Sequence, residues 1–204
     1  MNPLLVAAQE VLRWLDTQDI GGCLIGGLAV SRWGEPRLTH DIDYTVLAEI
    51  GSEEKVIDIL LQKFTPRLAD ARDFALRHRV LLLRASNGVD IDMALGATSF
   101  EVDSVRRATP FEFAVGCILR TCAAEDLIVH KVVAGRPQDI ADIRGIVNRQ
   151  LGKLDLKLIR YWFKAFGEVK EDPDLARPFE DALKQAEGLS KRRRKSPSSA
   201  RRKS

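Results

Sequence analysis

Residues 80–95 have the pattern of a β-hairpin. A strongly apolar run over 80–85 is followed by Asn87-Gly88 and by a second run over 89–95 in which apolar and acidic residues alternate. An Asn-Gly pair between two such runs favours a tight turn, because both central positions of that turn need positive φ. The sequence therefore predicts two antiparallel strands here.

Outside this hairpin, helices and strands first alternate, and helices dominate after residue 123. Short apolar or alternating runs predict strands at 23–25 and 41–47, and residues 97–123 show no regular pattern. We expect a core domain over 1–123, a C-terminal helical part over 124–189 and a disordered basic tail over 190–204. Apolar residues at helical spacing predict helices at 3–18, 28–33, 53–64, 124–134, 138–150, 155–166 and 173–188.

Charge is distributed unevenly along the 204 residues. Residues 190–204 contain eight Lys/Arg and no acidic residue, whereas the rest of the chain contains 24 Lys/Arg and 29 Asp/Glu. The net charge of +3 therefore comes from the tail, and the body of the protein is acidic. A tail of this composition is typical of a disordered terminus, which either binds nucleic acid without sequence preference or only aids solubility.

Composition also limits where the protein works. No apolar run approaches the roughly 20 residues that span a bilayer, and the N-terminus lacks the basic start of a secretion signal. The three cysteines form no CxxC pair and lie among apolar neighbours, which predicts buried thiols rather than a disulfide framework or a zinc site. We therefore expect a cytoplasmic protein without a membrane partner.

Two carboxylates lie two residues apart in the predicted strand Asp41–Leu47. Side chains i and i+2 of a strand point to the same face, so Asp41 and Asp43 project together while Ile42 packs inward. Adjacent carboxylates repel each other unless a cation lies between them, and Mg²⁺ prefers hard oxygen ligands. The pair predicts a metal site, although a single such pair is also compatible with two solvated acids on an exposed strand.

A second pair of carboxylates occurs on the returning strand of the hairpin. Asp90 and Asp92 again share one face of an otherwise apolar run. Isolated acids in strands that look buried are energetically costly, so two such pairs favour a metal site over chance. Three carboxylates can hold two Mg²⁺ ions and support phosphoryl displacement, and the third can also act as a general base. Alternation alone does not decide between Asp90 and Asp92 as the third acid.

Gly26-Gly27 ends one predicted strand just before a predicted helix. Glycines allow a backbone to approach phosphate oxygens closely, and the N-terminus of a helix offers free N–H groups. Ser31 lies one turn along this helix. The segment is a candidate phosphate-binding site, although glycine pairs are also common in ordinary turns.

Lys131 lies in the predicted helix 124–134 and is a candidate contact for triphosphate oxygens. Asp139 and Asp142 are spaced i, i+3 near the start of the next helix, after Arg136. These acids either support Lys131 or Arg136 or only interact favourably with the helix dipole.

These motifs together resemble a known superfamily. Gly26-Gly27, thirteen intervening residues, Asp41-Ile42-Asp43 and a later acid on an apolar strand are similar to the signature of the polymerase-β-like nucleotidyltransferases. The stretches GGLAVSRWGEPRLTHDIDYTV, VDIDMALGATSFE and EDLIVHKVVAGRPQDIADIRGIV resemble AbiEii-type nucleotidyltransferase toxins and their relatives, over about residues 20–150. Two departures are Gly27, which stands where Ser is frequent, and the long gap before Asp41.

The resemblance implies an α/β (α+β) nucleotidyltransferase fold, in which helices flank a mixed β-sheet and a C-terminal helical part closes over the nucleotide. It implies that Gly26 and Gly27 face the triphosphate, with Ser31 and Lys131 as further nucleotide-binding candidates. Asp41 and Asp43 are implied as catalytic metal ligands. Asp92 is favoured over Asp90 as the third, because its spacing to Thr98 matches the relatives.

The implied activity is Mg²⁺-dependent transfer of NMP from ATP or another NTP to an acceptor, with release of pyrophosphate. Two Mg²⁺ ions are expected, with Mn²⁺ as an alternative. RNA such as tRNA, a protein side chain and a small alcohol are candidate acceptors, and the basic tail favours RNA. The toxin resemblance also implies an antitoxin protein as a partner. The alternative is a regulatory module that binds nucleotide or nucleic acid without turnover.

Overall fold

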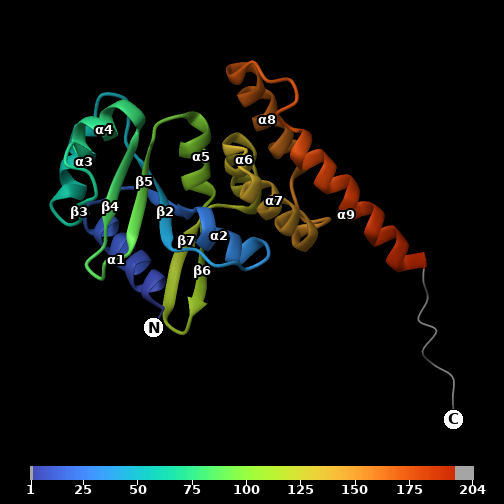
Figure 1. The fold of residues 1–204 in the computed structure, drawn as a ribbon, viewed down its shortest axis with the longest axis horizontal. Helices are drawn as coiled ribbons and strands as arrows, with labels where there is room; N and C mark the ends of the chain where they lie inside the picture. The colour runs from blue at the N-terminus through green and yellow to red at the C-terminus, as the bar shows by residue number, and fades with distance from the viewer. Residues whose placement is uncertain (1, 196–204) are drawn as a thin grey trace, which may run out of the picture. The chain divides into compact units, whose positions relative to one another are not determined.

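The computed structural model describes residues 2–195, with a mixed α/β architecture (Figure 1). The chain forms two compact units. The first contains Met1–Arg32 and Pro36–Leu127, and the second contains Trp33–Glu35 and the chain from Ile128 onward. Within the described part of the chain, no helix combines the length and apolar character needed to cross a membrane.

A seven-stranded mixed sheet forms the centre of the first unit, in the order β3-β4-β5-β2-β1-β7-β6. The pairs β2–β5 and β1–β7 are parallel, and the remaining neighbours are antiparallel. This mixed sheet confirms the predicted fold class. The strands are β1 (Gly22–Ile25), β2 (Asp41–Leu47), β3 (Thr65–Pro66), β4 (Val80–Arg84), β5 (Asp90–Gly96), β6 (Thr109–Ala114) and β7 (Cys117–Thr121).

The two faces of the central strands differ in polarity because side chains alternate along them. One face is apolar apart from the Tyr44 hydroxyl, and it packs into a single core whose helical residues come mostly from α1 (Pro3–Thr17), α3 (Glu53–Leu61) and α4 (Ala71–His78). Tyr44 belongs to this core, and its buried hydroxyl donates to the Ala8 carbonyl over 2.9 Å. The aspartates of β2 and β5 alternate with these core residues and therefore lie on the opposite face.

The first unit contains two further helices, α2 (Gly26–Trp33) and α5 (Ser99–Arg107). Helix α5 begins at a capping box. The Thr98 hydroxyl accepts from the Glu101 backbone N–H, and the Glu101 carboxylate accepts from the Thr98 backbone N–H at 2.9 Å. Close to this box, a Cβ added to Gly96 would lie 2.9 Å from the Thr45 side chain and 3.0 Å from Glu101, so α5 packs closely against β2 and β5.

The second unit is helical. Helix α6 (Ala124–Ala134) leads into it from the first unit, and α7 (Pro137–Gln150), α8 (Leu156–Lys170) and α9 (Arg177–Lys195) follow. Its core includes Phe163 and Phe179, whose rings meet edge-to-face with centroids 5.5 Å apart. All four segments were predicted as helices: the bounds of α6 match, and those of α7, α8 and α9 differ by one to seven residues.

Two expectations are corrected by the structure, and two elements lie in a segment for which none was predicted. Residues 97–123 are not irregular: they form α5 and the β6–β7 hairpin, which hydrophobic periodicity missed because β6 is mostly exposed and α5 is short. The elements β3 and α4, between residues 65 and 78, were not predicted. Residues 190–195 continue α9 rather than starting a disordered tail, consistent with the high helix propensity of Lys and Arg. The rest of the predicted tail, 196–204, lies outside the described residues.

All three cysteines are buried and free, as predicted. Burial raises the pKa of the Cys23 thiol to about 12. This thiol is therefore protonated at neutral pH and is an inert part of the core.

We expect the α5 capping box to contribute measurably to stability. Thr98→Ala removes the oxygen that accepts the Glu101 N–H, and loss of an N-cap typically lowers the free energy of unfolding by about 1 kcal/mol. Thr98→Ser keeps that oxygen and should remain close to the wild type. Urea denaturation followed by circular dichroism measures both, and equal stability of the two variants would contradict the cap assignment.

Candidate active site

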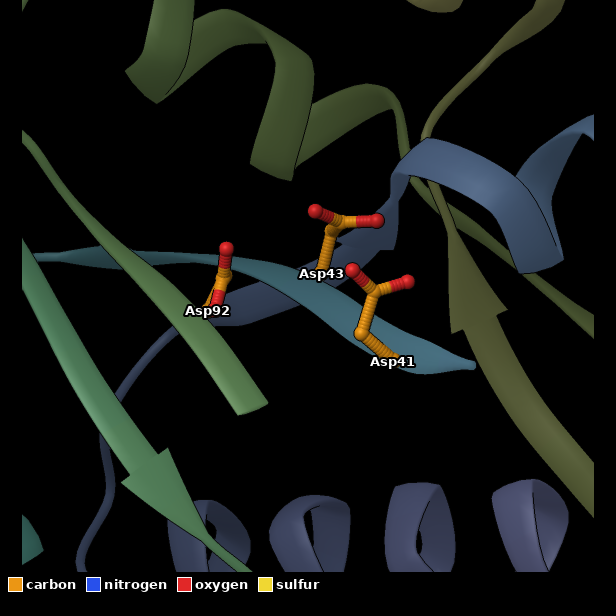
Figure 2. A group of neighbouring side chains, drawn as sticks. All are labelled: Asp41, Asp43 and Asp92. Carbon is orange, nitrogen blue, oxygen red and sulfur yellow. The ribbon is translucent and has the colours of Figure 1, made fainter. Parts of the chain in front are cut away.

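Three carboxylates converge on the polar face of the sheet. Asp41 and Asp43 rise from β2 and Asp92 rises from the neighbouring β5, all on the same side (Figure 2). One carboxylate oxygen of each lies within 4.8 Å of the others. Among residues 2–195, they form the one group of three or more His, Cys, Asp or Glu side chains close enough to hold a metal ion.

Strand register brings these residues together. In the parallel pairing of β2 with β5, Asp43 is opposite Asp92 and Asp41 is opposite Asp90. Paired residues of adjacent strands point to the same face, so four carboxylates share this part of the sheet. Two distant sequence motifs therefore become neighbours through one strand pairing.

Asp90 is engaged by two arginines, one of which it shares with Asp92. Its carboxylate accepts from Arg84 Nε at 2.9 Å and from Arg67 Nη1 at 3.0 Å. The Arg84 hydrogen bond, supported by Arg67, lowers the pKa of Asp90 below its usual range. Asp90 is thus held on the side of β4 and β3, and the geometry groups Asp92 with Asp41 and Asp43.

Asp92 is in a different electrostatic environment. Its carboxylate forms an ion pair with Arg67 Nη2, and its side chain is 37% exposed. Burial raises the pKa of Asp92, and the nearby negative charge of Asp41 adds to this, although Arg67 opposes it. A divalent cation at this position would favour the ionised carboxylates.

The two glycines fit closely around the acids. Gly26 has a φ of +61°, and a Cβ placed on it would lie only 1.8 Å from Asp43 Oδ2. The next backbone N–H, that of Gly27, donates to the same oxygen over 3.4 Å. The N-terminus of α2 is therefore adjacent to Asp43, and any residue larger than glycine at position 26 would have to displace that carboxylate.

Thr39 links the loop before β2 to the acid cluster. A Cβ on Gly27 would lie 2.6 Å from Thr39 Oγ1, so the second glycine is needed for this close packing. The Thr39 hydroxyl donates to Asp41 Oδ1 over 2.8 Å and orients that carboxylate. The glycine pair thus has a demonstrable packing role beside the acids, apart from any contact with phosphate.

The other two predicted nucleotide-binding residues are placed differently. Ser31 is half-buried, and its hydroxyl donates to the Gly27 carbonyl within α2 over 3.4 Å. Lys131 is buried in the second unit, where Nζ lies 2.8 Å from Asp139 Oδ1 and 2.9 Å from Asp142 Oδ2. Arg136 also binds Asp139, so this acid supports both cations.

Arg67 and Arg84 are parts of the site that the sequence did not suggest. Arg84 ends the apolar strand β4, and Arg67 directly follows β3, which has only two residues. No local pattern marks either residue, because their place beside the aspartates depends on the order of strands β3, β4 and β5 in the sheet.

The donor set fits a hard divalent cation. Three carboxylates supply only oxygen ligands, as Mg²⁺ and Mn²⁺ prefer, and the site lies next to a helix N-terminus that can receive phosphate oxygens. Such an arrangement can bind a metal–triphosphate complex and stabilise the charge that develops during phosphoryl transfer.

Residues 3–177 match a protein-family model described as "Nucleotidyltransferase of unknown function (DUF6036)". No curated protein matches this sequence.

Several solved structures are similar in fold. An antigenic nucleotidyltransferase-like protein from Paracoccidioides brasiliensis is 17% identical, with a TM-score of 0.47, over 87% of this chain and 90% of that one. The antibiotic-resistance factor ANT(2'')-Ia is 14% identical, with a TM-score of 0.42, over 94% and 97% of the two chains. The Thermotoga maritima CCA-adding enzyme, complexed with tRNA, is 14% identical, with a TM-score of 0.38, over 90% and 48%. Because these TM-scores are below 0.5, family membership rests on the family-model match.

The close approach of Gly26 to Asp43 gives a testable expectation. Gly26→Ala adds both left-handed backbone strain and a clash with the Asp43 carboxylate, whereas Gly88→Ala adds strain alone, since Gly88 has a φ of +86° and nothing within 4 Å. Gly26→Ala should therefore be the less stable variant by about 1–3 kcal/mol, the usual range for overpacking. Thermal or urea denaturation measures the difference, and equal losses would contradict the packing described here.

Proposed function

The chain belongs to the DUF6036 family of nucleotidyltransferases, and on that premise we propose that it transfers NMP from an NTP to an acceptor hydroxyl with the help of Mg²⁺. The observation that carries this proposal is the convergence of Asp41, Asp43 and Asp92 within 4.8 Å on one face of the sheet. The predicted core over 1–123 would carry this chemistry.

In the proposed reaction, an acceptor oxygen attacks the α-phosphorus of the NTP. The bond from that phosphorus to the bridging oxygen of the β-phosphate breaks, and pyrophosphate leaves with the bonding electrons. Bound Mg²⁺, as one or two ions, would neutralise the triphosphate and the charge that develops on it. Asp41, Asp43 and Asp92 would hold the metal, with Mn²⁺ as a substitute.

The residues around the acids would orient these groups. Thr39 fixes Asp41 through its hydroxyl, and Gly27 N–H contacts Asp43. Gly26 and Gly27 would bring the N-terminus of α2 against the triphosphate, where the dipole of the helix favours negative charge. Ser31 would support the first turn of α2 and would not contact phosphate itself, because its hydroxyl already donates to the Gly27 carbonyl within that helix. The proton of the acceptor hydroxyl would pass to one of the cluster carboxylates acting as general base.

RNA is the acceptor that we propose. The sequence of residues 190–204 carries eight Lys/Arg and no acid, and such a segment attracts a polyanion without sequence preference. An aminoglycoside or another small cationic alcohol would gain nothing from this tail. A role in a toxin–antitoxin pair belongs to the same proposal, and it predicts that a partner protein suppresses transfer.

Substitution of the cluster acids tests the enzymatic proposal. Asp43→Asn and Asp92→Asn should lower Mg²⁺-dependent NMP transfer and pyrophosphate release by at least about a thousandfold, since each removes a metal ligand. Labelled NTPs are incubated with Mg²⁺, with and without tRNA, and both products are measured. Nucleotide binding without pyrophosphate release by the wild type would instead favour a non-catalytic binding module.

Asp90→Asn is the matched control for these variants. Asp90 shares the sheet face with Asp92 but is engaged by Arg84 and Arg67. We expect its loss to reduce transfer far less than Asp92→Asn does. If Asp90→Asn were the more damaging substitution, the assignment of the third ligand to Asp92 would be wrong.

For Lys131 we propose a structural role in place of the phosphate contact that the sequence suggested. Its side chain is only 5% exposed and is engaged by Asp139 and Asp142, which are also buried. Buried acids that lose their cation are strongly destabilising. The helical unit would therefore depend on Lys131 for its stability.

Lys131→Met should lower the free energy of unfolding by about 3–5 kcal/mol, because it removes the buried cation that Asp139 and Asp142 share, although Arg136 still engages Asp139. Lys157→Met on the exposed surface of α8 is the control and should change stability by about 0.5 kcal/mol or less. Denaturation curves and NTP titrations of each variant separate the two roles. A stable Lys131→Met protein with weakened NTP binding would restore the phosphate-contact interpretation.

A further inference from the structure

Arg67 is an unusual neighbour for a metal site. Its guanidinium bridges two acids of β5: Nη1 lies 3.0 Å from Asp90 Oδ2, and Nη2 forms an ion pair with Asp92 Oδ1. One of these acids, Asp92, belongs to the candidate metal-binding group. The same carboxylate therefore faces an arginine on one side and the metal position on the other.

The sheet fixes Arg67 in this place. Its backbone N–H donates to the Leu82 carbonyl over 3.0 Å, Leu82 is opposite Asp92, and Asp92 is opposite Asp43. Arg67 thus stands at the end of a row of residues that crosses the three strands β4, β5 and β2. Because the anchor is a backbone hydrogen bond, the guanidinium can release Asp92 while the residue keeps its position.

The guanidinium of Arg67 is not fully hydrogen-bonded. The Nε atom of Arg67 is buried and has no hydrogen-bond partner in the described part of the chain. Leaving a buried donor unsatisfied typically costs about 1–3 kcal/mol. The ion pairs with Asp90 and Asp92 are therefore the polar contacts that hold the guanidinium beside the metal-binding group.

Charge on this face explains what the contact can do. Four carboxylates lie on this face as two adjacent pairs, Asp41 with Asp90 and Asp43 with Asp92. The guanidinium groups of Arg67 and Arg84 offset two of these four negative charges. Arg84 contacts Asp90 only, whereas Arg67 also reaches Asp92. Arg67 is therefore the cation that offsets repulsion within the metal-binding group itself.

We propose that Arg67 is an internal counter-cation of the metal site. It holds Asp92 in place while no divalent cation is bound, and metal binding must displace it from that carboxylate. The protein thereby keeps its acids assembled and binds free metal more weakly than three carboxylates alone would. Arg67 is a positioning residue, and this inference rests on the metal-binding role of the proposed function.

Titration with Mn²⁺ in the absence of nucleotide tests the inference directly, with free Mn²⁺ measured by electron paramagnetic resonance. Arg67→Gln removes a competing cation and should bind Mn²⁺ on the order of tenfold more tightly than the wild type. Arg67→Lys keeps a positive charge and should return the affinity toward the wild-type value. Arg84→Gln removes the same charge from the same face without touching Asp92, and should tighten binding by less than about threefold.

Unchanged or weaker Mn²⁺ binding by Arg67→Gln would overturn the inference. It would also be overturned if Arg84→Gln tightened Mn²⁺ binding as much as Arg67→Gln does, because the effect would then come from net charge alone.

Nuclear magnetic resonance of the wild type provides a second measurement that does not depend on any variant folding. Saturating Mg²⁺ should shift the Arg67 side-chain Nε–H resonance more than that of Arg84, and an unmoved Arg67 resonance would contradict displacement. If these effects occur but no acceptor receives NMP, the proposed reaction fails and the counter-cation inference stands.

Discussion

The parallel pairing of β2 with β5 is the contact on which the rest of the candidate site depends. It places Asp43 beside Asp92 and Asp41 beside Asp90, although the two motifs are far apart in the sequence. The opposite faces of the same strands are buried in the core with α1, α3 and α4. If either strand shifted by one residue, its aspartates would point into the core and its apolar residues to the other face. The register that buries the apolar residues is therefore also the register that brings the acids together.

Electrostatics then divides four similar carboxylates into two kinds. Arg84 and Arg67 engage Asp90 and lower its pKa, whereas burial raises the pKa of Asp92. Thr39 and the N-terminus of α2 contact Asp41 and Asp43. Asp41, Asp43 and Asp92 are consequently held close together by neutral donors and by Arg67, which limits the repulsion between their negative charges.

Much of this arrangement could be predicted from the sequence, because alternation is a local property. Asp41 and Asp43 were predicted to lie on one face and Ile42 on the other, and strand β2 has the predicted bounds Asp41–Leu47. Non-local features were missed. Arg67 reaches Asp92 only through the β3–β4–β5 order, and α5 begins at a capping box within a stretch without clear periodicity. For Lys131, the sequence showed nearby acids but not that all three groups are buried.

The central claim is that Asp41, Asp43 and Asp92 form one metal site. The most direct measurement is anomalous diffraction from crystals soaked in Mn²⁺, with and without a non-hydrolysable NTP analogue. The account predicts an anomalous peak within coordination distance, about 2.2 Å, of oxygens from all three aspartates. Mn²⁺ bound to Asp90 in place of Asp92, or no peak on this face of the sheet, would contradict it.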